Sequence, residues 1–198
     1  MDTIGHWEDR PREIGTAQKW KCGLCDKNVA TNEAFFARVG VKNGPASAIA
    51  GAIVFCPSCQ HPTYLSASGG PQIPSERYGN PVDYLPADIE QLYGEARDCT
   101  GVGAQTASVM ICRKLLMHIA VENGAQTGLS FIEYVDYLEK NGHTPSKSRE
   151  WVDRIRKKGN EANHQITRMG VDDSHELLDF TEMLLKIVYE YPTRGKKP

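Results

Sequence analysis

Two short stretches, Trp20-Lys-Cys-Gly-Leu-Cys-Asp-Lys27 and Val54-Phe-Cys-Pro-Ser-Cys-Gln-His61, decide how the first third of the chain folds. Each holds two cysteines separated by two residues, a spacing that lets one tight turn direct both thiolates at a single ion. Four soft sulfur ligands at tetrahedral corners are what Zn²⁺ takes in a structural site. We therefore predict one structural zinc ion with four cysteine ligands. These are Cys22, Cys25, Cys56 and Cys59.

Other uses of these cysteines fit the sequence less well. A redox Cys-x-x-Cys motif stands alone beside a βαβ pattern, whereas this chain has two motifs and no such pattern. His61 follows the last of the four cysteines closely and His6 lies far upstream, so we interpret both as surface histidines. Four thiolates leave zinc no open position for a catalytic water. Cys99 and Cys112 lie in helical patterns and are interpreted as free thiols.

The residues around the two cysteine turns indicate a small antiparallel sheet. Residues 48–55 are strand-like and lead into the second turn, and residues 34–41 also read as extended. We predict a zinc-ribbon domain over residues 1–65. Residues 66–86 are dense in Gly, Pro and Ser without an apolar period, which is typical of a linker.

The rest of the chain, residues 87–198, has the apolar spacing of helices and lacks strand-like alternation. The helices are expected over residues 87–99, 104–123, 130–140, 146–164 and 174–191, with Pro192 ending the last one. The second of these is apolar on nearly all sides, so we expect it to be the most buried helix. The expected fold class is a small β zinc ribbon followed by an all-α helical bundle.

Composition limits the classes of protein that this chain can belong to. It has 198 residues, of which 40% are hydrophobic and 24% charged, and a formal net charge of −2. These values exclude a disordered chain and a globally basic nucleic-acid coat. No stretch is apolar enough to cross a bilayer and the start lacks the order of a secretory signal, so we expect a cytoplasmic protein with no membrane partner.

Three polar residues in the helical region are candidates for a catalytic site. Arg156, Asn160 and His164 are spaced four and four, so on a continuous helix they share one stripe. A histidine moves protons near neutral pH, an arginine holds a phosphate, and an asparagine orients either of them. The alternative is that Asn160 and His164 only cap or support a helix end. Spacing alone leaves both interpretations open.

The segment Arg156-Lys-Lys-Gly-Asn-Glu-Ala-Asn-His164, which follows Arg113-Lys-Leu-Leu and the cysteine turns, resembles a bacterial family of uncharacterised domains related to HEPN proteins. The resemblance extends from about Cys56 to Tyr189 and includes Glu95-Ala-Arg. It implies a HEPN-like helical bundle. HEPN domains usually dimerise, and many are metal-independent ribonucleases of toxin systems and anti-phage defence, with arginine and histidine motifs that meet at the dimer interface.

Carried onto this chain, the resemblance assigns His164 to the family histidine and Asn160 to the polar residue four positions before it. The commonest HEPN motif has an arginine directly before that polar residue, where this chain has Gly159; Arg156 lies one turn earlier on the same stripe. The implied reaction is attack of an RNA 2′-hydroxyl on the adjacent phosphate. His164 would move the protons and Arg156 would stabilise the developing negative charge. We interpret Arg113 as a buried, paired arginine.

Two hypotheses about function follow. The first is a metal-independent, toxin-like endoribonuclease of anti-phage defence that acts on RNA as a homo-oligomer, at least a dimer. A phage component, such as a ring-forming protein, would activate it. The second is a non-catalytic module in which the ribbon binds protein or nucleic acid and the helical bundle only dimerises. Gly159, at the position of the missing arginine, favours the second.

Overall fold

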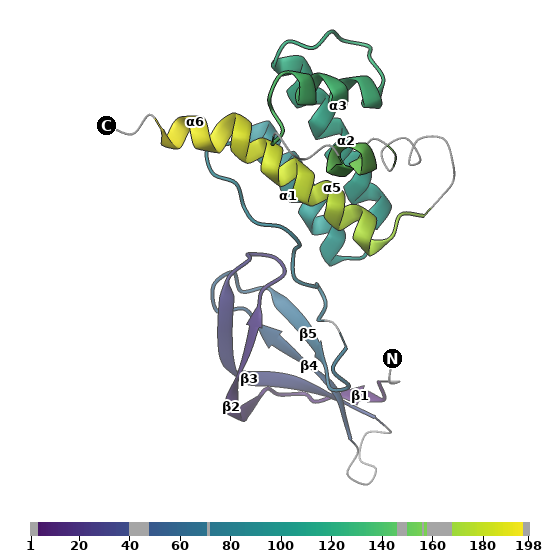
Figure 1. Ribbon diagram of the computed structural model, residues 1–198. Coiled ribbons are helices and arrows are strands. Elements are labelled where there is room, and N and C mark those ends of the chain that lie inside the picture. Colours follow the sequence, from purple (N-terminus) through teal and green to yellow (C-terminus); the bar gives the residue numbers. More distant parts are fainter. Residues whose placement is uncertain are drawn as a thin grey trace. The chain divides into compact units, whose positions relative to one another are not determined.

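The computed structural model describes residues 4–39, 48–70, 72–145, 150–155, 157 and 168–195. The chain divides into two compact units, Met1–Arg77 and Tyr78–Pro198, each with its own hydrophobic core. All the described strands belong to the first unit and all the described helices to the second (Figure 1).

The first unit is a curled antiparallel sheet. Its strands are β1 (His6–Trp7), β2 (Arg12–Lys21), β3 (Asn28–Arg38), β4 (Ile49–Phe55) and β5 (Pro62–Ser66). The order is β1-β3-β4-β5, and β2 also pairs with β3. In the first half of β3 the partly buried Val29 packs in the cysteine core, whereas in the second half the buried Ala34 and the partly buried Phe36 do, so the strand changes its inward face along its length. A register shift between Glu13 and Gln18 of β2 accompanies this change, as expected where a sheet bends.

The expected fold class is wrong for this part of the chain. A small ribbon followed by an all-α bundle does not describe five strands, of which β2 and β3 have 10 and 11 residues, so the chain is mixed α/β. The sequence pattern missed β2 because most of its side chains are exposed, and an exposed strand lacks the apolar alternation that marks a half-buried one. The helices that follow the sheet do not by themselves identify a HEPN fold.

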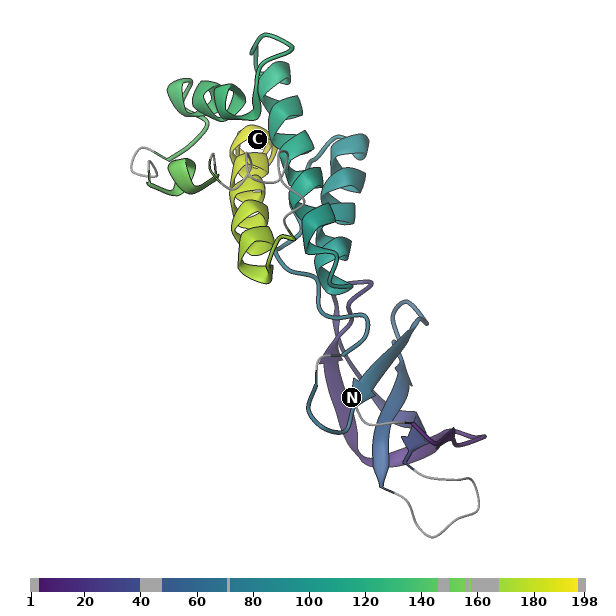
Figure 2. The same ribbon diagram turned by 90° about the vertical axis from the view of Figure 1, so that its right-hand side faces the viewer.

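The second unit is built around α2. Its helices are α1 (Ala87–Gly101), α2 (Gln105–Glu122), α3 (Phe131–Lys140), α5 (Val171–Leu185), the π-helical turn η1 (Lys186–Glu190) and α6 (Tyr191–Arg194). Residues 150–155 are also helical. Helix α2 contacts α1, α3 and α5 and lies among them in the ribbon (Figure 2). Leu116 and Ile119 on α2 are completely buried. This agrees with the prediction that the most apolar helix lies at the centre.

Local signals explain some helix ends and not others. Helix α3 begins as its sequence predicts, because the Ser130 side chain accepts from the Glu133 backbone while Glu133 accepts from the Ser130 backbone. Pro192 does not end the last helix. It lies in the first turn of α6, directly after η1, where the missing proline N–H is tolerated. None of the described helices combines the length and apolar character needed to cross a bilayer.

Candidate functional site

The two cysteine turns have the same backbone geometry. The Cys22 N–H donates to the Lys27 carbonyl (2.9 Å), and the Cys56 N–H donates to the His61 carbonyl (3.0 Å). The residue after the second cysteine of each turn has a positive φ, 63° at Asp26 and 61° at Gln60. One turn joins β2 to β3 and the other joins β4 to β5. The sheet therefore presents two matching pairs of thiols to one point.

The four sulfur atoms lie within 4.8 Å of one another. The Sγ atoms of Cys22 and Cys59 are 3.7 Å apart, as are those of Cys25 and Cys56. Cys22 and Cys56 are completely buried in a core with Trp20. The structure thus brings together all four cysteines that the spacing singled out, in a cluster compatible with a metal ion.

Ionisation of these thiols is uneven. Burial raises the pKa of Cys56, but hydrogen bonds from the backbone of Cys59 and Ser58 outweigh it and lower the pKa to about 7. For Cys59 the backbone of His61 lowers the pKa, but burial and the neighbouring thiols outweigh it and raise the pKa to about 12. The first thiolate of the cluster forms readily and the last does not. A bound cation would remove this difference, because it stabilises every thiolate.

The backbone of residues 72–75 covers the first cysteine turn. The Gln72 amide donates to the Lys21 carbonyl at 2.8 Å. A Cβ atom at Gly23 would lie 2.2 Å from the Ser75 carbonyl oxygen, so only glycine permits this approach. His61, by contrast, is exposed and its Nδ1 lies 2.8 Å from the Cys59 carbonyl oxygen. Neither His61 nor His6 belongs to the cysteine cluster.

The predicted catalytic residues Arg156, Asn160 and His164 lie outside the described residues. Both flanks of that segment are anchored. On one side Ile155 is fully buried in the helical core, and on the other the Met169 N–H donates to the Thr106 hydroxyl of α2 at 3.1 Å. The described residues on the two sides of the segment therefore lie in the helical core and at the first turn of α2.

Arg113 on α2 is buried as expected, but the part of the chain that the structure describes supplies no ion pair for it. Its side chain is only 4% exposed, and its guanidinium lies 4.3 Å from the centre of the Phe131 ring. Its Nη1 has no hydrogen-bond partner among the described residues, and burial lowers its pKa. Arg97 on α1 is equally buried but donates to the carbonyls of Tyr78 (3.0 Å) and Gly79 (2.7 Å). Sequence patterns gave no signal that separates these two arginines.

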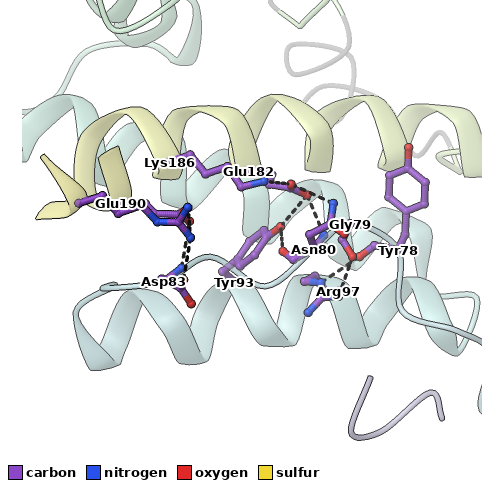
Figure 3. A network of polar contacts seen from close by, with 10 residues as sticks. Tyr78, Gly79, Asn80, Asp83, Tyr93, Arg97, Glu182, Lys186 and Glu190 are labelled. Carbon is purple, nitrogen blue, oxygen red and sulfur yellow. Dashed lines mark hydrogen bonds and ion pairs between the residues drawn. The ribbon is translucent and has the colours of Figure 1, made fainter. Parts of the chain in front are cut away.

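A polar network links residues 78–83 to the helices (Figure 3). No sequence pattern predicted this network. Glu182 of α5 accepts from the Asn80 backbone at 2.8 Å and forms an ion pair with Lys186. Burial raises the pKa of Glu182, but the hydrogen bonds from Lys186 and Asn80 outweigh it and lower the pKa. Glu190 accepts from the Asp83 backbone at 3.1 Å. These carboxylates are structural, because their oxygens are occupied by groups of the fold.

Tyr78 extends the same network to the start of α5. Its ring stacks on the His175 ring with centroids 3.5 Å apart and planes 4° apart, and its hydroxyl donates to Asp179 at 3.0 Å. Burial lowers the pKa of His175. The sequence offered no context for this histidine, and its contacts give it a packing role.

Comparison with known proteins places the helical unit in a family. The family model described as "Domain of unknown function (DUF4145)" matches residues 94–197, just over half of the chain. The chain belongs to the DUF4145 family. Neither a curated protein nor a solved structure matches it. The DUF4145 region begins within α1 and contains Arg113 and the segment 156–164, but it excludes the sheet with its cysteine cluster.

Proposed function

We propose that this DUF4145 protein is an endoribonuclease whose chemistry comes from His164 and Arg156 and whose sheet is held together by zinc. The observation that carries the proposal is the four-and-four spacing of Arg156, Asn160 and His164 inside the family region. The contacts of the other buried groups support it by elimination. Among the described residues of the helical unit, the buried acids Glu182 and Glu190 are occupied by backbone and basic partners.

The chemistry follows from the resemblance to HEPN-related proteins. An RNA 2′-oxygen forms a bond to the adjacent phosphorus, and the bond from phosphorus to the 5′-oxygen breaks. His164 takes the proton of the 2′-hydroxyl and, once protonated, supplies a proton to the leaving 5′-oxygen. Arg156 stabilises the charge on the phosphoryl oxygens with a planar, permanently charged guanidinium, and Asn160 orients its neighbours. The products are a 2′,3′-cyclic phosphate and a 5′-hydroxyl.

Zinc is the metal that the cysteine cluster fits best. With Zn–S bonds of about 2.3 Å, the sulfur atoms of a regular tetrahedron are about 3.8 Å apart. The two 3.7 Å separations in the cluster agree with that value. When bound, the ion supplies folding free energy and a fixed geometry to the two turns. Four thiolates complete its coordination, so the ion acts as a structural staple. Cysteines that bind a metal or stay unoxidised, as proposed for all six, favour a reducing, cytoplasmic location.

The resemblance also suggests the biological setting, anti-phage defence with the sheet unit as the recognition module. A histidine and an arginine supplied by two subunits would make cleavage depend on assembly, so the active form is at least a dimer. A ring-forming phage protein that gathers several copies is the trigger to examine. Unchanged activity in a variant kept monomeric would contradict this part of the proposal.

The proposal is tested by expressing the wild type, His164→Ala and His143→Ala in bacteria, with and without phage challenge. His143 follows α3 and is a matched control, because it lies outside the stripe. We expect the wild type and the control to restrict phage and to generate new 5′-hydroxyl RNA ends, and His164→Ala to do neither. If none of the three generates new RNA ends while folded and zinc-loaded, the non-catalytic alternative, which Gly159 favours, replaces the ribonuclease. Equal cleavage by all three excludes His164 from the site.

A further inference from the structure

One face of the sheet is aromatic and points away from the cysteine core. Residues paired directly across antiparallel strands share a face, so Phe35, Ile53 and Tyr64 lie in one row across β3, β4 and β5. The side chains of Phe36 and Val54 belong to the opposite face and pack with the cysteines. The aromatic face therefore contributes nothing to the metal-bearing core.

The rings on this face are arranged in two pairs. Phe35 and Phe55 meet edge to face with centroids 6.1 Å apart, and Trp7 and Tyr64 do so at 6.2 Å. Phe55 is 46% exposed and Trp7 36%. Gly51 lies under Tyr64, since a Cβ there would be 2.4 Å from the tyrosine oxygen. The glycine lets the ring lie close to the sheet.

Trp7 also lines a hollow of about 420 Å³ that is rich in arginine. Glu8 accepts from Arg38 at 2.6 Å and pairs with Arg12 at 2.7 Å, which fixes both guanidinium groups at the rim. A guanidinium has five N–H groups, so the ion pair with Glu8 uses only part of the donor capacity of the exposed Arg12. Arg10 and His6 complete the basic lining, against the acids Glu8 and Asp9.

We propose that this face binds single-stranded RNA, with bases stacked on the exposed rings of Phe55 and Trp7 and a phosphate in the arginine-lined hollow beside Trp7. The choice of RNA rests on the proposed function. The face would hold the substrate strand by contacts that do not depend on sequence, because every base has a flat face to stack.

Charge favours a nucleic acid over a protein partner. The hollow carries three arginines and a histidine against two acids, so its lining is positive overall. Strands β4 and β5 lie within residues 43–75, which contain no Asp or Glu, so these strands present no like charge to a phosphate backbone. The combination of exposed rings with a bordering basic hollow is what a single strand requires.

The test measures binding of a short fluorescein-labelled oligouridine to full-length protein carrying His164→Ala, which prevents cleavage. Phe55→Ala is compared with Ile49→Ala, because both side chains lie on β4 and are similarly exposed, at 46% and 44%. We expect roughly 5- to 140-fold weaker binding for Phe55→Ala, the loss of one stacked base, and little change for Ile49→Ala. Phe55→Tyr should retain binding. Zinc content and circular dichroism confirm that each variant is folded.

The hollow is tested separately by salt dependence. Arg10→Gln should lower the slope of log affinity against log salt by about 0.7, the value for one lost phosphate contact on a single strand. Lys140→Gln, which removes one positive charge from α3 and not from the hollow, should leave the slope unchanged. Equal RNA affinities of Phe55→Ala and Ile49→Ala overturn the inference. It is also overturned if Phe55→Ala changes self-association of the protein but not its RNA binding. If RNA binding depends on Phe55 but the wild type cleaves nothing, this inference stands and the ribonuclease proposal fails.

Discussion

Replacing Glu182 tests whether the network in Figure 3 holds residues 78–83 against the helices. Glu182→Ala removes the acceptor of the Asn80 backbone and the partner of Lys186, both at least partly buried. An orphaned buried donor costs about 1–3 kcal/mol, and breaking a fully buried ion pair about 3–5 kcal/mol. The Lys186 side chain is 24% exposed and recovers part of this loss in water. We expect Glu182→Ala to lower the free energy of unfolding by about 2–4 kcal/mol.

The assay is urea unfolding followed by the helical signal in circular dichroism. Glu182→Gln keeps an acceptor for Asn80 but not the charge for Lys186, so we expect a smaller loss, about 1–2 kcal/mol. The matched control is Glu95→Ala, since Glu95 is an exposed acid on α1, and its change should stay within about 0.5 kcal/mol. A loss for Glu182→Ala no larger than that of Glu95→Ala would refute the assignment of a structural role to this network.

The remaining predictions concern pH, the buried arginines and the metal. Because the pKa of Glu182 is lowered in the folded protein, its contribution is present above the unfolded pKa of about 4.3 and is lost as pH falls through the folded pKa. The stability gap between wild type and Glu182→Gln should therefore shrink in urea titrations between neutral pH and about pH 3. Arg97→Met should lower the free energy of unfolding by about 2–4 kcal/mol, because two carbonyls lose their donor, whereas Arg113→Met should change it by less than about 1 kcal/mol. Equal losses for the two arginines would contradict the difference in pairing. Cys25→Ser should reduce the amount of bound zinc, measured by elemental analysis. It should also unfold the sheet unit while the helical signal in circular dichroism persists. Full zinc occupancy in this variant would exclude Cys25 as a ligand.

Short-range patterns predicted the parts of this molecule that are determined locally. The spacing of each cysteine pair encodes its own turn, so the cluster could be predicted although Cys22 and Cys59 are 37 residues apart. Ser130 and Glu133 form their capping box within one turn of chain, and α3 accordingly begins where its sequence predicts. In both cases the residues that decide the structure are neighbours in the sequence.

The features that the sequence patterns did not predict depend on partners far away in the sequence, or on side chains exposed to solvent. The contact between Asn80 and Glu182 spans 102 residues, and no periodicity encodes it. Strand β2 pairs with β3 but keeps most side chains in water, which removes the apolar alternation that marks a strand. The continuation of the helix past Pro192 depends on the π-helical turn before it. The side chain of Arg113 packs on the Phe131 ring of α3, a contact that its own helix does not encode.

The central claim, cleavage of RNA by His164 through the 2′-hydroxyl, is tested most directly with purified protein and a defined RNA containing one cleavage site. The wild type and His164→Ala are incubated with this RNA and with a copy that carries a single 2′-deoxy substitution at that site, and the new ends are mapped. We expect 5′-hydroxyl and cyclic phosphate ends only for the wild type acting on the unmodified RNA. Equal cleavage by His164→Ala, or cleavage at the 2′-deoxy position, would contradict it.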